Sequence, residues 1–211
     1  MAHANDYDRI AGNYDAISQL FFRKAIVRSQ QVLFPFLSSP ATILIVGGGT
    51  GWILEEIAEI HSSGLQITYL DLSGKMIALA KNRDWKQNIV TFIQSDIQEY
   101  KSEQHFDFII TPFLFDNFKP DRAHAIFAQL DRWLAPNGLW LFADFHVQDN
   151  SNGIWQKVML KCMYLFFNAI ARVETKELTD MDVLFKQEKY ETVFESSHFS
   201  RFIQARVYRR N

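Results

Sequence analysis

Residues 43–52 read Ile-Leu-Ile-Val-Gly-Gly-Gly-Thr-Gly-Trp. The apolar run is typical of a strand buried on both faces of a parallel sheet, and the glycines after it predict a loop that leads into a helix. In such a unit, backbone N–H groups and a helix N-terminus lie at the mouth of the sheet, and a ligand can rest against backbone without Cβ atoms. We therefore predict a ligand site at the carboxyl end of this first strand.

Short apolar runs alternate with longer amphipathic ones along the chain, and this alternation predicts an α/β fold with a largely parallel sheet. Strands are expected at Thr42–Val46, Gln66–Leu70, Ile89–Gln94, Phe106–Thr111 and Leu139–Phe145. Helices are expected between them at Gly51–His61, Gly74–Arg83 and Asp121–Leu134. The last helix should end in a turn at Ala135–Gly138, where proline and glycine occur.

The pattern changes after the fifth expected strand. It predicts a long apolar helix at about Gly153–Arg172, a helix at Thr179–Gln187 and an antiparallel pair of strands at Tyr190–Ser196 and Arg201–Tyr208. The elements together predict a Rossmann-like, doubly wound, mostly parallel sheet of about seven strands that ends in an antiparallel pair. The 211 residues fit a single domain, with a helical N-terminal cap (1–39), a cofactor-binding core (40–145) and C-terminal helices and strands (146–211).

Composition and charge argue against several classes of protein. With 48% hydrophobic residues the chain can fold alone, and a formal charge of -2 gives no field that would concentrate nucleic acid. Cys162 is the only cysteine, so no intrachain disulfide can form, which fits a reducing compartment. The most apolar stretch, 158–170, is shorter than the roughly 20 residues of a spanning helix. The N-terminus lacks the apolar core of a signal peptide, so we expect a cytoplasmic protein without stable membrane insertion.

The spacing of the glycines discriminates among nucleotide ligands. A dinucleotide fingerprint requires Gly-x-Gly-x-x-Gly, but the sixth position counted from Gly47 is Trp52, and the third position counted from Gly48 is Thr50. A phosphate-binding P-loop would also need a Lys-Ser or Lys-Thr pair, which this loop lacks. The spacing therefore weakens the hypothesis of a nicotinamide-dependent oxidoreductase.

The pattern that does occur, Gly47-x-Gly49-x-Gly51, resembles the first motif of the class I S-adenosylmethionine-dependent methyltransferases. Asp71 ends the next expected strand. A carboxylate at this position can accept hydrogen bonds from both hydroxyl groups of a ribose. The alternative role for Asp71 is the N-cap of the following helix.

Three further segments match the family in the same order. Asp96 and Ile97 follow the third expected strand, and the resemblance places them beside the adenine amino group and the adenine ring, with a cap as the alternative role of Asp96. Phe108–Phe113 resembles the strand whose end faces the methionine part of the cofactor. Leu134–Trp140 resembles the Leu-x-Pro-Gly-Gly turn before the fifth strand.

The resemblance covers about Tyr7–Phe145 and implies S-adenosylmethionine as the cofactor and S-adenosylhomocysteine as its product. One departure is Ile45, since the family commonly has an acidic residue there, which indirectly anchors the methionine amino group. The cofactor-binding residues that we expect are Gly47, Gly48, Gly49, Gly51, Asp71, Leu72, Met76, Asp96, Ile97 and Thr111.

Methyl transfer from a sulfonium needs mainly proximity and orientation, and a general base only when the nucleophile arrives protonated. The segment Tyr7–Asp15 is similar to one that closes over the cofactor in quinone-biosynthesis and other small-molecule methyltransferases, which makes Tyr14 a candidate contact near the methyl group. His146 and Asp116, after the fifth and fourth strands, are the other catalytic candidates. The alternatives are a surface or cap-packing tyrosine, a histidine satisfied by backbone and a loop cap. No Cys/His cluster has metal-ligand spacing, so no metal is expected.

Aromatic residues near the expected site favour a small, hydrophobic or aromatic methyl acceptor, although most of them also fit a core. Base-modifying methyltransferases carry Asn or Asp before Pro-Pro-aromatic, whereas Thr111-Pro112-Phe113 does not, which disfavours DNA. The apolar helix expected at 153–172 is a candidate for a substrate lid, a dimer contact or a transient membrane-surface patch, and both monomer and homodimer stay open. The alternative to an enzyme is a non-catalytic module that binds or senses S-adenosylmethionine.

Overall fold

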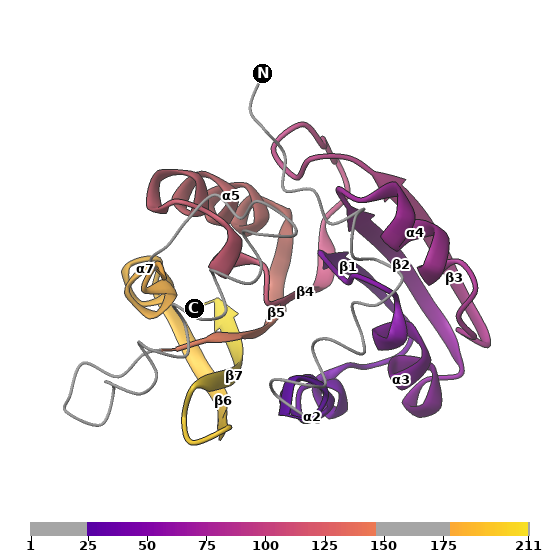
Figure 1. The fold of residues 1–211 in the computed structure, drawn as a ribbon, viewed down its shortest axis with the longest axis horizontal. Coiled ribbons are helices and arrows are strands. Elements are labelled where there is room, and N and C mark those ends of the chain that lie inside the picture. Colours follow the sequence, from indigo (N-terminus) through magenta and orange to yellow (C-terminus); the bar gives the residue numbers. More distant parts are fainter. Residues whose placement is uncertain (1–24, 147–177, 211) are drawn as a thin grey trace.

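The computed structural model describes residues 25–146 and 178–210 (Figure 1). The cofactor-binding core expected at 40–145 therefore lies within the described residues. Tyr14 and the apolar helix expected at 153–172 lie outside them. Among the helices in the described ranges, none is long and apolar enough to cross a bilayer.

A seven-stranded sheet has the order β3-β2-β1-β4-β5-β7-β6. β1 to β5 pair in parallel, whereas β7 pairs antiparallel with both β5 and β6. The predicted fold class and the antiparallel C-terminal pair are confirmed. The strands are β1 (Ala41–Val46), β2 (Ser63–Asp71), β3 (Gln87–Gln94), β4 (Phe106–Pro112), β5 (Leu134–Phe145), β6 (Tyr190–His198) and β7 (Ile203–Arg210).

Helices connect these strands and lie on both faces of the sheet (Figure 1). The expected helix Gly74–Arg83 is shorter in the structure, because the chain turns after Ala80 and Arg83 reaches back to the carbonyl of Thr50 (3.0 Å). The helices, with η for a 3-10 helix, are α2 (Ala25–Gln31), η3 (Phe34–Phe36), α3 (Trp52–Ile60), α4 (Gly74–Ala80), η4 (Phe115–Asn117), α5 (Pro120–Trp133) and α7 (Met181–Gln187).

The turn predicted at Ala135–Gly138 is wrong in one respect, because these residues belong to β5. Between its paired residues Leu134 and Leu139, β5 contains more residues than the facing part of β4, which makes a bulge. Asn137 in this bulge has φ +64°, a conformation that asparagine tolerates better than most residues. Proline and glycine here mark a bulge at the start of a strand rather than a turn before it.

Each face of the sheet carries its own hydrophobic core. One core, which includes Trp140 and Phe185, packs beneath α5 and α7. The other packs beneath η3 and α3 and includes Ile43 and Ile45. Because successive side chains of a strand point to opposite faces, Leu44 enters the first core and its neighbours enter the second. This arrangement explains why β1 reads as an unbroken apolar run.

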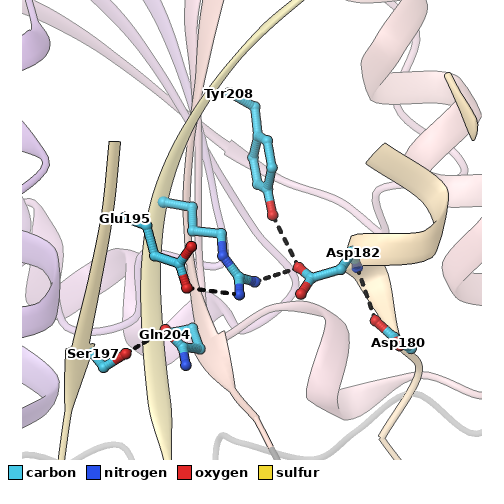
Figure 2. A network of polar contacts seen from close by, with 7 residues as sticks. Asp180, Asp182, Glu195, Ser197, Gln204 and Tyr208 are labelled. Carbon is cyan, nitrogen blue, oxygen red and sulfur yellow. Dashed lines mark hydrogen bonds and ion pairs between the residues drawn. The ribbon is translucent and has the colours of Figure 1, made fainter. Parts of the chain in front are cut away.

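A polar network joins α7 to the C-terminal strand pair, as Figure 2 shows. Arg206 of β7, whose side chain is only 10% exposed, forms ion pairs with Asp182 of α7 and Glu195 of β6. The Tyr208 hydroxyl also donates to Asp182 (3.0 Å), and Asp180 caps α7 by accepting from the Asp182 N–H. A buried guanidinium is tolerated only with such partners, so the network fixes α7 against the sheet.

Replacing Arg206 with methionine should lower the free energy of unfolding by about 3 kcal/mol, because the change leaves Asp182 largely buried without its cation. Arg209→Met is the matched control. Arg209 pairs with Glu191 where both side chains are about half exposed, so its loss should stay below about 1 kcal/mol. Urea denaturation followed by circular dichroism measures both changes, and equal losses would contradict the role given to the network.

Candidate active site

The glycine loop lies at the carboxyl end of β1, where the strand order reverses. β1 pairs with β2 on one side and with β4 on the other. Open α/β sheets bind ligands at such switch points, outside the carboxyl ends of the strands. A cleft lies at this place and is lined by Val46, Gly47, Gly49, Leu70, Asp71, Leu72, Met76, Ser95, Asp96, Ile97, Pro112, Phe113, Leu114, Asn117, Phe118 and Arg122.

Asp71 binds the glycine loop and lines the cleft. Its carboxylate accepts hydrogen bonds from the backbone N–H groups of Gly49 (3.1 Å) and Ser73 (2.9 Å). The N-cap of α4 is Ser73, whose hydroxyl accepts from the N–H of Met76 (3.1 Å), so the alternative role of Asp71 as N-cap is wrong. A carboxylate offers about four acceptor positions, so these bonds do not prevent Asp71 from accepting ligand hydroxyl groups.

The glycines of the loop serve two purposes. Gly49 has φ +64°, and a Cβ added to it would meet no atom within 4 Å, so its backbone faces the open cleft. A Cβ on Gly48 would lie 2.5 Å from the Tyr69 hydroxyl, and one on Gly51 would lie 2.6 Å from Ala80 of α4. Gly48 and Gly51 therefore leave space for Tyr69 and Ala80. We expected both glycines to bind the cofactor, but neither of them lines the cleft.

Side chains beneath the loop hold it from both sides. Tyr69, fully buried on β2, donates its hydroxyl to the carbonyl of Gly49 (2.9 Å). Arg83 donates to the carbonyl of Thr50 and pairs with Glu55 of α3 (3.2 Å). Protein groups thus bind the N–H and the carbonyl of Gly49 as well as the carbonyl after it.

Gly48→Ala should destabilise the protein by about 1–3 kcal/mol, because its new methyl group would overlap the Tyr69 ring, which is fully buried. A double-mutant cycle isolates this clash. In a Tyr69→Leu background the same change should cost less, measured as the shift in the urea midpoint at constant slope. Equal costs in both backgrounds would show that Tyr69 is not the obstacle.

Asp96 follows β3 and lines the cleft together with Ile97. Its carboxylate accepts from the N–H of Gln98 (2.9 Å), so it caps a turn, which is the alternative that the sequence left open. The carboxylate also forms an ion pair with Arg122 of α5, whose side chain is 16% exposed. Sequence reasoning missed Arg122, because only the fold brings the first turn of α5 to the loop after β3.

The wall beside β4 differs from expectation. Thr111 is fully buried, and its hydroxyl accepts from the indole N–H of Trp140 (2.9 Å), so it does not line the cleft. Phe113 does line the cleft, with φ +51°, a strained conformation for a bulky residue, and its N–H donates to the carbonyl of Ala143 (2.7 Å). Ile45 is fully buried in the core behind the loop, so it presents nothing to a ligand.

Two buried carboxyl groups, Asp116 of η4 and Asp144 of β5, adjoin this wall. Asp144 accepts from the N–H groups of Phe115 (3.0 Å) and Phe145 (2.8 Å), and Asp116 accepts from the side-chain amide of Asn117 (2.7 Å). Burial, together with the charge of Asp144, raises the pKa of Asp116 well above its ordinary value. Burial also raises the pKa of Asp144 to about 7. Burial therefore favours the protonated form of both carboxyl groups.

These pKa shifts predict that stability falls as the pH rises from about 4 to about 7. In this window the unfolded chain has lost protons that the folded protein still holds on Asp116 and Asp144, so the free energy of unfolding decreases with pH. Asp116→Asn removes one of these groups and should flatten the decline, by at most about 1.4 kcal/mol per pH unit. Urea denaturation at several pH values measures both slopes, and parallel curves for the two proteins would contradict the prediction.

Two further candidates, His146 and Asp116, do not line the cleft. His146 directly follows β5, and its backbone N–H donates to the carbonyl of Phe202 (2.8 Å). Asp116 does not line the cleft, although its neighbour Asn117 does. Tyr14 lies outside the described residues. Within 25–146 and 178–210, no group of three His, Cys, Asp or Glu side chains could hold a metal ion.

The strand order, the glycine loop and the acid that ends β2 define a Rossmann-like domain with a cleft at its switch point. The family model described as a methyltransferase domain matches residues 43–138, which contain every residue that lines the cleft. Over this part the chain is similar to S-adenosylmethionine-dependent methyltransferases.

Known proteins share this similarity over part of their length. A malonyl-[acyl-carrier protein] O-methyltransferase of Halalkalibacterium halodurans is 36% identical over 110 residues, which are 50% of this chain and 40% of the relative. A demethylmenaquinone methyltransferase of Porphyromonas gingivalis is 31% identical over 124 residues, 54% of this chain and 49% of the relative. The chain thus matches less than half the length of either relative.

The fold also resembles solved methyltransferase structures. The 1,6-didemethyltoxoflavin-N1-methyltransferase of Burkholderia thailandensis, with 1,6-didemethyltoxoflavin and S-adenosylhomocysteine bound, aligns with a TM-score of 0.66 at 17% identity, covering 97% of this chain and 86% of that structure. At an identity this low, the similarity supports the fold and nothing further.

Proposed function

We propose that this chain is an enzyme that transfers a methyl group from S-adenosylmethionine to a small, hydrophobic or aromatic molecule, and that its 211 residues act as one domain. The observation that carries the proposal is the Asp71 carboxylate, which binds the glycine loop at the switch point and faces the cleft. The match of residues 43–138 to the methyltransferase domain model supports the same chemistry.

The lining of the cleft fits a nucleoside carried on a sulfonium. Asp71 would accept hydrogen bonds from the ribose hydroxyls, and the open face of Gly49 leaves room for a ligand against the backbone. Asp96 would accept from the adenine amino group. Apolar walls for the adenine ring come from Leu72, Met76 and Ile97.

S-adenosylmethionine supplies an electrophilic methyl group, whose displacement requires an acceptor held in line. The chain therefore has to orient that acceptor and exclude water. Where the acceptor arrives protonated, we assign the contact or the proton transfer to Tyr14, His146 or Asp116. Asp116 would act together with Asp144, because burial raises the pKa of both carboxyl groups.

A row of aromatic side chains supports an apolar or planar acceptor. Phe113 lines the cleft and packs against Phe145, with ring centroids 4.9 Å apart. Phe145 in turn packs against Phe202 at 5.1 Å. Of this row Phe113 lines the cleft, and an aromatic ring there favours flat, apolar ligands.

Calorimetric titration with S-adenosylhomocysteine tests the cofactor. The wild type should bind it, and Asp71→Asn should weaken binding roughly tenfold or more, because a charged acceptor is lost from the ribose site. Asp84→Asn is the control, since Asp84 pairs with Lys86 at the surface and lies outside the cleft. Binding of NADH but not of S-adenosylhomocysteine would overturn the proposal.

Transfer itself is measured with methyl-labelled S-adenosylmethionine and a panel of hydroquinones, phenols and acyl thioesters. Label should pass into an organic-extractable product and disappear with Asp71→Asn. Tight binding without transfer to any acceptor would instead favour a non-catalytic module that senses the cofactor.

A further inference from the structure

Arg122 joins two walls of the cleft. It stands in the first turn of α5 and forms an ion pair with Asp96, which lies in the loop after β3. Its Nε–H donates to the Gln98 side-chain oxygen (2.9 Å). Its guanidinium lies over the Phe118 ring, 4.8 Å from the ring centroid. Arg122 thus binds an acid, an amide and an aromatic ring at one end of the cleft.

These contacts define the geometry of the Asp96 carboxylate. One oxygen accepts from the N–H of Gln98, and the other faces Arg122, so the carboxylate has a fixed plane. Both charged side chains are largely buried, at 19% and 16% exposure, where an ion pair with planar geometry is strongly oriented. Phe118, only 8% exposed, is held by the same guanidinium and also lines the cleft.

We propose that Arg122 is a positioning residue for nucleobase selection: it orients Asp96 so that the site takes a purine with a 6-amino group and rejects one with a 6-oxo group. The inference rests on the proposed function, which places the adenine amino group beside Asp96. A carboxylate accepts hydrogen bonds and cannot donate to a 6-oxo group when ionised. A carboxylate that is free to turn would discriminate less between the two purines, because its accepting oxygen would no longer be held in one position against the edge of the base.

The test compares S-adenosylhomocysteine with S-inosylhomocysteine, which differ at this position of the purine. Both are titrated calorimetrically into the wild type and into Arg122→Gln. The wild type should prefer the adenosyl ligand by roughly tenfold or more. Arg122→Gln should weaken adenosyl binding more than inosyl binding and so reduce the ratio of the two dissociation constants. Arg122→Lys, which keeps the charge without the planar fork, should fall between them.

Arg132→Gln is the matched control, because it makes the same change on the exposed far end of α5. It should leave both dissociation constants unchanged. An unchanged ratio in Arg122→Gln, including an equal loss of affinity for both ligands, would overturn the inference and leave Arg122 with a structural role. Failure of the wild type to bind S-adenosylhomocysteine would instead overturn the proposed function and this inference with it.

Discussion

The Asp71 carboxylate holds together the loops that follow two neighbouring strands, β1 and β2, at the carboxyl ends of these strands. It accepts from the N–H of Gly49 in the loop after β1 and from the N–H of Ser73 in the turn before α4. Because β1 and β2 are parallel neighbours, these two loops necessarily leave the sheet on the same edge. A single carboxylate can therefore hold both loops in place, and residues of both loops line the cleft.

The sequence predicted the fold well, because parallel strands buried on both faces leave a strong signal in residues such as Leu44 and Ile45. It also predicted that Gly49, Asp71 and Asp96 meet at one edge, since topology alone brings the ends of β1, β2 and β3 together. The bulge at the start of β5 was not predictable, because proline and glycine favour a bulge and a turn alike.

Side-chain partners separated by many residues could not be predicted from the sequence. The glycine pattern identified the loop, but it did not reveal that Ala80 of α4 lies where a Cβ of residue 51 would be. Arg122 looked like one charge among several on a helix until the fold placed it against Asp96. Asp144 was overlooked for a similar reason, because only its burial in the fold raises the pKa of its carboxyl group.

The contacts beneath the glycine loop have a consequence for the thermodynamics of binding. Tyr69, Asp71 and Arg83 already order the loop through its own N–H and carbonyl groups. The conformational entropy of that segment is therefore lost when the chain folds and not when a ligand arrives. A preorganised loop of this kind lets association proceed by docking onto a finished surface, and it couples the integrity of the binding site to the stability of the sheet beneath it.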